Sequence, residues 1–393
     1  MSLLGKTWLG ELRTIFTDHG ARMILVEAAV LYSLFYPTPY RYEVPRKVPL
    51  AVLDMDRSDT SRKLVRLVDA GEAAAVKQHL GTAMEGKRAL LAGDVGGVLT
   101  IPRDFEWHMQ RGEQTTLGLY ADASYFLLYR QTFLNVKQAA ATLAASAKIA
   151  RFRAAGVPRE QAAIRQAPAG LVLRPLFNPW GGYSHYTVPP VLLLVMEQTL
   201  LMGVGFLGVT HRATAPVNST AGSRLATLTG RTMAYLTIYL VHSIYYFFCI
   251  PRIYSFVQRG NPLDMLCFAL PFFLATIFLG FALVPLYRYR EMPIELLLPL
   301  SLPFLFLSGF AWPQECMPAA VRWLAQLVPT TAAITGFLRI SKMGAALTDV
   351  LPEWITLWML TGGYGLCAWF ASARDQGMKA QSILLTQQKH GAR

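Results

Sequence analysis

Apolar residues gather into five long runs in the second half of the chain. Each run is close to the ~20 residues that cross about 30 Å of hydrocarbon. Backbone groups in lipid must hydrogen-bond within their own segment, so we expect all five runs to be helices. Pro271, Pro299 and Pro303 are expected to kink two of them. The predicted spans are 188–209, 232–250, 263–286, 293–311 and 353–371.

The N-terminal region predicts two further elements. Residues 1–21 place apolar and charged side chains at mostly helical spacing, which indicates an amphipathic helix on the membrane surface. Residues 22–38 form an apolar run with Glu27 inside it, and are expected to be the first transmembrane helix. A cleavable signal peptide is the alternative, but the run begins late and no small-x-small cleavage site follows it.

Residues 39–187 are polar enough to form a water-exposed domain. Short apolar runs alternate there with helical patterns, which is typical of an α/β domain. The predicted strands are Val48–Leu53, Val95–Ile101 and Thr116–Ala121, and the predicted helices are 60–70, 73–92, 103–111 and 125–155. The expected fold is a polytopic α-helical membrane protein of about six transmembrane helices, with this α/β domain inserted after the first and a five-helix region over 188–372.

Composition agrees with lipid contact. Charged residues make up 16% of the chain and the mean hydropathy is +0.33, whereas soluble domains carry roughly a quarter charged residues. The net charge of +13 comes from residues beside apolar runs rather than from a basic patch interleaved with aromatics, which excludes nucleic-acid binding. None of the four cysteines lies in 39–187, so that region has neither a disulfide framework nor a zinc spacing.

Basic residues near the span ends predict the orientation. Basic residues are more numerous in the N-terminal segment, the loop 210–231 and the tail 373–393 than in the loops on the other side of the predicted spans. Long polar domains do not contribute to this bias, so the region 39–187 is expected outside the cell and both termini in the cytoplasm. The inside set is Lys6, Arg13, Arg22, Arg212, Arg224, Arg231, Arg288, Arg290, Arg374, Lys379, Lys389 and Arg393.

Two patterns resemble nucleotide sites in their letters. Gly81–Lys87 fits the phosphate-loop pattern up to its last position, where the pattern requires Ser or Thr and this chain has Arg88. The segment also follows a predicted helix, whereas a phosphate loop follows a strand. Gly203, Gly205 and Gly208 match the dinucleotide fingerprint but lie inside an apolar span, where small residues let helices approach closely. We therefore expect no cofactor, metal or ATPase motif in this chain.

Asp54 and Asp56 follow a predicted strand and are similar to the paired carboxylates of aspartate-based phosphatases. A turn followed by a helix capped by Ser58 or Asp59 is the other interpretation, and we favour it. No catalytic residue is therefore predicted, although a membrane-bound phosphatase stays open as an alternative.

Polar side chains within the apolar spans are candidates for a substrate pathway. A charged group inside a membrane is costly and usually faces a bundle interior or a water path. A hydrogen bond between helices, or an interfacial position, is the structural alternative. The candidates are Glu27, Glu197, Gln198 and His242.

The loop 210–231 is predicted to lie in the cytoplasm. Its length suits a short helix along the membrane surface, and its basic residues suit either a docking site for a cytoplasmic partner or membrane anchoring alone. The candidate docking residues are His211, Arg212, Thr214 and Arg224.

The order of these parts resembles the permease subunits of type-2 ABC transporters, in the exporter class with a large external domain. Local sequence agrees across nearly the whole chain. The segments that carry the resemblance are Pro49–Arg62 (PLAVLDMDRSDTSR), Gly97–Gly112 (GVLTIPRDFEWHMQRG), Arg174–Pro179 (RPLFNP), Ser308–Pro318 (SGFAWPQECMP), Val328–Thr331 (VPTT) and Phe337–Arg339 (FLR).

The resemblance implies an ATP-driven exporter in a bacterial inner membrane, moving an amphipathic substrate: a drug-like compound, a lipid or a lipid-linked molecule. It also implies a second permease copy or paralogue, a separate ABC ATPase that binds ATP and magnesium, and a periplasmic adaptor, all in contact with membrane lipid. In this family an acidic-basic stretch followed by Gly-Thr usually contacts the ATPase. Thr210–Ala215 (THRATA) stands there instead, without acidic residues or glycine. A membrane-anchored scaffold without transport is the alternative function.

Overall fold

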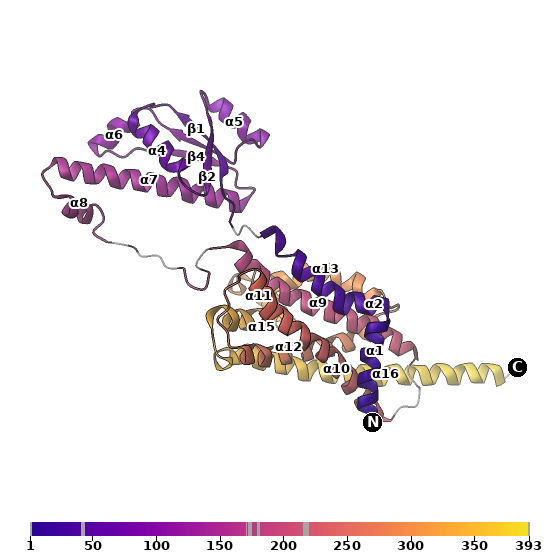
Figure 1. Cartoon of the computed structure of the whole chain (residues 1–393). Coiled ribbons are helices and arrows are strands. Elements are labelled where there is room, and N and C mark those ends of the chain that lie inside the picture. Colours follow the sequence, from indigo (N-terminus) through magenta and orange to yellow (C-terminus); the bar gives the residue numbers. More distant parts are fainter. Residues whose placement is uncertain are drawn as a thin grey trace. The chain divides into compact units, whose positions relative to one another are not determined.

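The chain folds into two compact units in a computed structural model (Figure 1). The α/β unit is Val44–Arg174, and the helical unit combines Met1–Glu43 with Pro175–Arg393. The structure describes residues 2–40, 44–169, 171, 175–178, 181–214 and 220–391, with side chains as far as residue 374. The predicted tail residues Lys379, Lys389 and Arg393 therefore lie outside the described side chains.

The α/β unit is built on a four-stranded sheet in the order β2-β1-β3-β4, in which only β4 is antiparallel to its neighbour. Leu50 and Val52 of β1 face the helices α4 and α7, whereas Ala51 between them faces α5. The elements are β1 (Val48–Asp54), α4 (Asp59–Asp69), β2 (Ala74–His79), α5 (Ala83–Ala92), β3 (Gly97–Ile101), α6 (Phe105–Arg111), β4 (Gly118–Ala121), α7 (Phe126–Ala154) and α8 (Arg159–Gln166).

The expectation of one helix over 73–92 is wrong, because its first part is the edge strand β2. Ala74 and Lys77 favour helices locally. However, the open edge of β1 offers backbone partners, and Asp69 Oδ1 accepts a hydrogen bond from the Val76 amide at 2.9 Å. Long-range pairing therefore overrides local propensity here. The structure confirms the other predicted strands, which are β1, β3 and β4, and the predicted long helix, which is α7.

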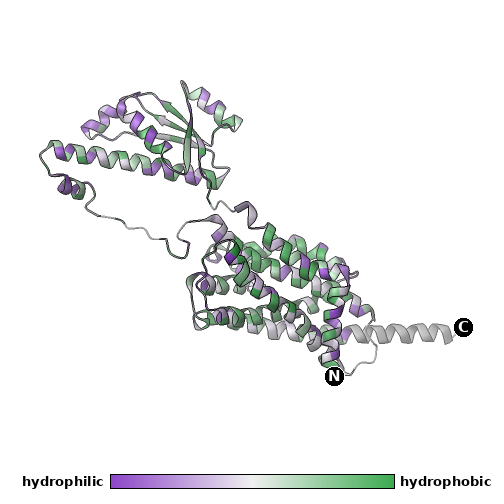
Figure 2. Ribbon diagram, in the orientation of Figure 1, coloured by the Kyte–Doolittle hydropathy of each residue, from purple (hydrophilic) through white to green (hydrophobic). Residues whose placement is uncertain are grey.

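The helical unit holds the apolar runs. Figure 2 shows its helices mostly in the hydrophobic colour, in contrast with the mixed colouring of the α/β unit. Its main elements are α1 (Leu3–Thr17), α2 (His19–Arg22), η1 (Met23–Glu27), α3 (Ala28–Phe35), α9 (Tyr183–Thr214), α10 (Ala221–Ile244), η3 (Tyr245–Cys249), α11 (Ile250–Ile253), α12 (Pro262–Leu283), η4 (Val284–Leu286), α13 (Met292–Leu307), α14 (Ala319–Ala325), α15 (Pro329–Leu338), η6 (Arg339–Met343) and α16 (Leu351–Gly391). Short 3-10 turns complete it at η2 (Thr38–Tyr40), η5 (Gln314–Cys316) and η7 (Leu347–Val350).

Three helices in the described part of the chain are long and apolar enough to cross a membrane, namely Tyr183–Thr214, Ala221–Ile253 and Pro262–Leu286, and the shorter Met292–Leu307 is also apolar. The most apolar stretch of the first is 94% buried inside the protein, against 50% and 56% for the other two. Helix α9 is therefore the central helix of the unit, and it packs against α12, α13, α15 and η1.

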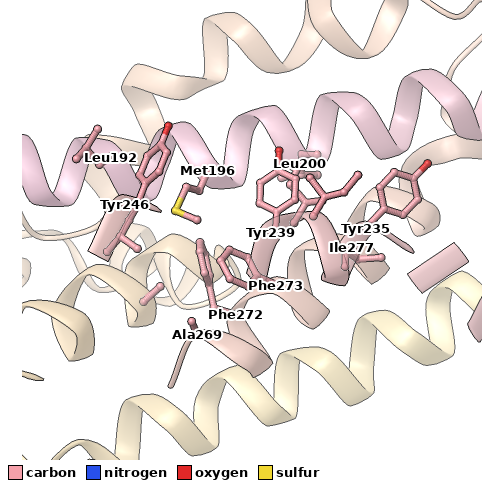
Figure 3. Close-up of a cluster of buried hydrophobic side chains, with 14 of the residues drawn as sticks. Leu192, Met196, Leu200, Tyr235, Tyr239, Tyr246, Ala269, Phe272, Phe273 and Ile277 are labelled. Atoms are coloured by element: carbon pink, nitrogen blue, oxygen red, sulfur yellow. The ribbon is translucent and has the colours of Figure 1, made fainter. Parts of the chain in front are cut away.

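The core around α9 is formed by large side chains from three helices (Figure 3). Met196 and Leu200 of α9 lie beside Tyr239 of α10 and Phe273 of α12. The rings of Tyr239 and Phe273 are tilted at a centroid distance of 5.7 Å, in the range that aromatic pairs prefer. The three helices thus share one apolar cluster.

Glycines on α9 allow neighbouring elements to approach it closely. A Cβ atom at Gly203 would lie 2.2 Å from Leu25 Cδ2, and one at Gly208 would lie 2.4 Å from Val284 Cγ2. A Cβ atom at Gly205 would likewise lie 2.9 Å from Pro293 Cβ of α13. The expectation that this glycine pattern serves helix packing is confirmed.

We expect Gly203→Ala to destabilise the protein by about 1–3 kcal/mol, because the added methyl group overpacks the contact with Leu25. The matched control is Gly222→Ala at the start of α10, where a Cβ meets nothing within 4 Å. That control is expected to gain up to about 1 kcal/mol from helix propensity. Thermal unfolding in mild detergent measures both, and equal melting temperatures would contradict this packing.

Candidate functional site

A buried carboxylate joins the central helix to the start of α15. Glu197 of α9 is 0% exposed, and its Oε1 accepts a hydrogen bond from the backbone amide of Thr330 at 3.2 Å. Thr330 is the second residue of α15, so its amide is one of those that the helix itself leaves unpaired. The partial positive charge at this end of the helix favours a carboxylate. Glu197 therefore caps a helix that is distant in sequence.

Several buried polar atoms on α9 and in the first turn of α15 have no hydrogen-bond partner among the described residues. They are Glu197 Oε2, both amide atoms of Gln198, and the hydroxyl groups of Thr330 and Thr331. Buried polar atoms in proteins are normally paired, so these atoms are candidates for contacts with water or with a polar group of a ligand. Sequence analysis missed the two threonines, because only the buried α15 brings them to α9.

The other two predicted pathway residues, His242 and Glu27, have partners of their own. His242 of α10 is buried and lies edge-on to Tyr239, with ring centroids 5.1 Å apart. Tyr239 in turn donates a hydrogen bond to Thr199 Oγ1 of α9 at 2.8 Å. Glu27 instead forms a half-exposed ion pair with Arg22 at 2.8 Å. The π-helical turn η1 ends at Glu27 and brings these residues together five positions apart.

A second buried carboxylate joins the N-terminal helix to α9 and α10. Glu11 of α1 is 4% exposed, and its Oε1 accepts a hydrogen bond from Tyr235 OH at 2.8 Å. Its Oε2 lies 3.3 Å from His211 Nε2 and 3.5 Å from Arg231 Nε. Burial raises the pKa of the Glu11 carboxyl, and this effect outweighs the nearby Arg231 charge and the Tyr235 hydrogen bond, which lower it.

Sequence analysis missed Glu11 as a functional candidate, although a signal is present. Leu4, Trp8, Glu11 and Ile15 share one face of the helix at spacings of four, three and four. Trp8 and Glu11 both reach α10, where the Trp8 indole donates to Thr237 Oγ1 at 3.3 Å. An acidic residue on an apolar stripe predicts a buried partner.

The basic residues of the loop 210–231 bind three different parts of the unit. Arg212 donates to the carbonyl oxygens of Val284 and Tyr287 at 3.0 and 2.8 Å, so it holds the end of α12. The Arg224 guanidinium lies over the Trp369 ring of α16, 5.1 Å from its centroid. Thr214 bonds only weakly, at 3.4 Å, to carbonyl groups of its own helix. His211 joins α1 through Glu11.

The described residues of this loop belong mostly to the two flanking helices, which are longer than predicted, and not to a separate short surface helix. Helix α9 continues to Thr214, and α10 begins at Ala221, where Thr220 Oγ1 accepts a hydrogen bond from the Ser223 amide. Both helices extend beyond the apolar stretch because packing against α1 and η4 stabilises their polar ends. Residues 215–219, which include the last residue of the predicted THRATA stretch, lie outside the described residues.

The aspartate pair of the α/β unit forms structural bonds. Asp54 accepts hydrogen bonds from the amides of Asp56 and Arg57 and from Ser61 Oγ. Asp56 accepts from the amides at the start of α6, at 3.0 and 3.1 Å. Ser58 caps α4, as expected. Both carboxylates thus serve the turn and the helix caps.

The segment Gly81–Lys87 follows a strand after all, since β2 precedes it. However, α5 begins already at Ala83 with Thr82 as its cap, and Glu85 accepts a hydrogen bond from the Gly81 amide at 2.9 Å. The segment is therefore the first turns of a helix rather than an open loop around a phosphate.

The family of the chain follows from a comparison with known proteins. A family model described as "ABC-2 family transporter protein" matches residues 23–370. The chain belongs to the ABC-2 transporter family. Two curated relatives are each 24% identical to it over 375 residues, which cover 90% of this chain and 92% of theirs. Both are named inner membrane transport permease YhhJ, one from Escherichia coli (strain K12) and one from Shigella flexneri.

Membership in the ABC-2 family makes the chain a multi-pass membrane permease, a transporter subunit rather than an enzyme. Its partner is an ABC ATPase. The family model covers Glu197 of α9 and also His211 and Arg231, the partners of Glu11, whereas Glu11 itself lies on α1, which precedes the matched residues.

Replacement of Glu197 distinguishes a helix cap from a side chain without structural role. We expect Glu197→Ala to cost about 1–3 kcal/mol of stability, because it leaves the buried Thr330 amide without an acceptor. Glu197→Gln keeps an oxygen acceptor and should retain most of the stability. Thermal unfolding measures both, with Glu315→Ala at an exposed position as the control. If Glu197→Ala melts like this control, the cap is absent.

The raised pKa of Glu11 predicts a pH dependence. A carboxyl whose pKa is higher in the folded than in the unfolded protein stabilises the fold below the unfolded value of 4.5 and loses that contribution as pH rises through the folded value. The melting temperature of the wild-type protein, minus that of Glu11→Gln, should therefore fall as pH rises from about 4 to about 8. Lys6→Gln on the exposed face of α1 is the control. A difference in melting temperature that does not change with pH would contradict a raised pKa for Glu11.

Proposed function

We propose that this chain is the permease subunit of an ATP-driven exporter of amphipathic substrates in a bacterial inner membrane. Six crossings are formed by η1 with α3, α9, α10 with α11, α12, α13 and α16. Both termini lie in the cytoplasm and the α/β unit lies outside. A second copy or a paralogue completes the pathway, and a separate ATPase binds ATP and magnesium.

The direction of the helices supports this topology. Glu11, Arg212 and Arg290 join four elements at one end of the helical unit. These elements are α1, the end of α9, the start of α10 and the segment after α12. This end carries the basic residues that predict the cytoplasmic side. Asp18, just after α1, pairs with Arg290 at 2.7 Å, and the pKa of this carboxyl is lowered despite a burial effect that opposes it, through bonds to the Ala21 amide and to Arg290.

The observation that carries the proposal is the set of contacts around the α9–α10 connection. His211 and Arg231 hold α1 through Glu11, Arg212 holds the end of α12, and Arg224 lies on α16. A displacement of this connection by an ATPase would thus be passed to three helices at once, namely α1, α12 and α16. Since α9 also carries Glu197, the same displacement reaches the cap of α15. This is a physical route for a two-state transition.

The surroundings of Glu197 support the proposed class of substrate. Its unpaired oxygen and the neighbouring unpaired amide and hydroxyl groups offer polar contacts inside an otherwise apolar core. An amphipathic molecule satisfies both kinds of surface. The α/β unit is the part that a periplasmic adaptor would bind.

Co-purification with the ATPase encoded beside this chain tests the proposal. We expect a stable complex whose ATP hydrolysis changes by about 2- to 30-fold in Arg212→Ala, as for mutations that alter coupling by 0.5–2 kcal/mol. The control, Arg322→Ala, removes an exposed charge from α14 and should leave hydrolysis unchanged. Absence of any ATPase in the complex would favour a membrane-anchored scaffold that binds a partner without transport.

A further inference from the structure

A cleft in the α/β unit opens at the carboxyl ends of β1 and β2. Its volume is about 510 Å³, and one side of it is open to solvent. Val52 of β1, Val65 of α4 and Leu80, which follows β2, form the apolar part of its lining. Ligand pockets commonly measure roughly 300–1,000 Å³. The cleft therefore has room for a small molecule or for the head group of a larger one.

The topology of the sheet leaves this opening. Helices α4 and α5 lie on opposite faces of the sheet (Figure 1). Leu64 of α4 packs with Val52, and Ala89 of α5 packs with Ala51. The connections that leave β1 and β2 thus lead to opposite faces, so the strand ends between them stay open. Open α/β sheets commonly bind ligands in a crevice outside the carboxyl ends of their strands.

The polar part of the lining is cationic. Three arginines line the cleft, namely Arg57, Arg62 and Arg66. His79, the last residue of β2, lines it as well. The side chains of Arg57, Arg66 and His79 form no hydrogen bond or ion pair with another residue of the described chain. Their donors are therefore available to a ligand.

The start of α4 brings the three guanidinium groups together. Arg62 and Arg66 lie one turn apart on the same face of the helix. Arg62 Nη1 donates to the Arg57 carbonyl at 2.6 Å, which joins the helix to the loop before it. Arg62 also pairs with the exposed Asp59 at 2.7 Å, but a guanidinium has five N–H donors, so others remain. The three arginines can thus contact one ligand.

Hydrogen bonds fix the loop that carries Arg57. Its φ of +56° lies in the left-handed region, which is costly for a residue with a side chain. Asp54 Oδ1 accepts a hydrogen bond from the Arg57 amide at 2.9 Å, and Ser61 Oγ donates to Asp54 Oδ2 at 2.6 Å. Within the described chain, Asp54 is the one acidic side chain that lines the cleft, and these donors compensate its charge. The cleft therefore keeps an excess of positive charge.

This lining favours a phosphate over a carboxylate as the ligand group. The planar guanidinium fork matches the oxygen atoms of both groups. However, a phosphate monoester carries a charge of about −1.5 to −2 at pH 7 and three acceptor oxygens, whereas a carboxylate carries a single charge and two oxygens. Three guanidinium groups beside one compensated carboxylate match the larger charge.

We propose that this cleft binds a phosphate monoester, with the phosphate at Arg57, Arg62 and Arg66 and the organic part against the apolar lining. A phosphorylated sugar and a lipid with a phosphate monoester head, such as phosphatidic acid, share this group. The site belongs to the α/β unit, so it is separate from the polar atoms around Glu197, and binding there requires neither an ATPase nor transport.

Calorimetric titration of the purified full chain, in nonionic detergent at low salt, tests the site. The probes are glucose 6-phosphate and dihexanoyl phosphatidic acid. Each has a control without the monoester, namely glucuronate for the sugar and dihexanoyl phosphatidylcholine for the lipid. A control should bind about tenfold or more weakly than its probe, because it makes fewer charged hydrogen bonds. Backbone hydrogen exchange should slow on binding within the segments 54–66 and 79–80.

Substitutions on and off the cleft separate this site from general attraction between charges. Arg57→Gln and Arg66→Gln should each weaken binding by about 10- to 100-fold, since each removes charged hydrogen bonds. The matched control is Lys63→Gln, which removes an exposed charge from the same helix at a position that does not line the cleft. Arg66→Lys keeps the charge but loses the fork, so its affinity should lie between those of the wild-type protein and Arg66→Gln. Melting temperatures confirm that each variant is folded.

Three outcomes would overturn the proposal: no binding of either probe, equal binding of a probe and its control, or equal weakening by Lys63→Gln and Arg66→Gln. Tighter binding of glucose 6-phosphate assigns the site to a soluble phosphate ester, and tighter binding of phosphatidic acid assigns it to a lipid. Because the titration uses this chain alone, its failure leaves the proposed pairing with an ATPase untouched, and the reverse also holds.

Discussion

Close packing around α9 is the constraint on which the helical unit depends. Its most apolar stretch is 94% buried inside the protein, so its neighbours, and not lipid, must supply nearly all of its contacts. Gly203 and Gly208 permit this, because larger side chains would collide with Leu25 and Val284. In a membrane, helices gain little from burying apolar surface, since lipid is equally apolar, and close van der Waals contact becomes the main attraction.

A helix surrounded in this way cannot leave its polar groups to water. Glu197 therefore accepts from the Thr330 amide of α15, and His211 at the far end of α9 meets Glu11 of α1. Both carboxylates bind elements far away in sequence. A buried charge of this kind adds little to the free energy of unfolding, but it favours one arrangement of the helices. Any arrangement that separates the partners leaves a buried polar group unpaired.

These two carboxylates also give the ABC-2 family architecture a mechanical consequence. The end of α9 that carries His211 and Arg212 is bonded to α1 and to the end of α12, and Glu197 in its middle is bonded to α15. Movement of the α9–α10 connection thus cannot remain local.

The sequence by itself determined the apolar helices, the α/β character of residues 39–187 and the family resemblance, since these depend on periodicity and composition. It also identified Glu197 as a costly side chain within an apolar span and His211 as a member of the basic loop. Tertiary structure alone decided their partners. The edge strand β2, the extension of α9 to Thr214, the buried α15 with Thr330, and the role of Glu11 all arise from contacts between residues far apart in the chain. Local propensity carries no information about such contacts, because their free energy depends on which backbone edge or helix end a distant segment brings near.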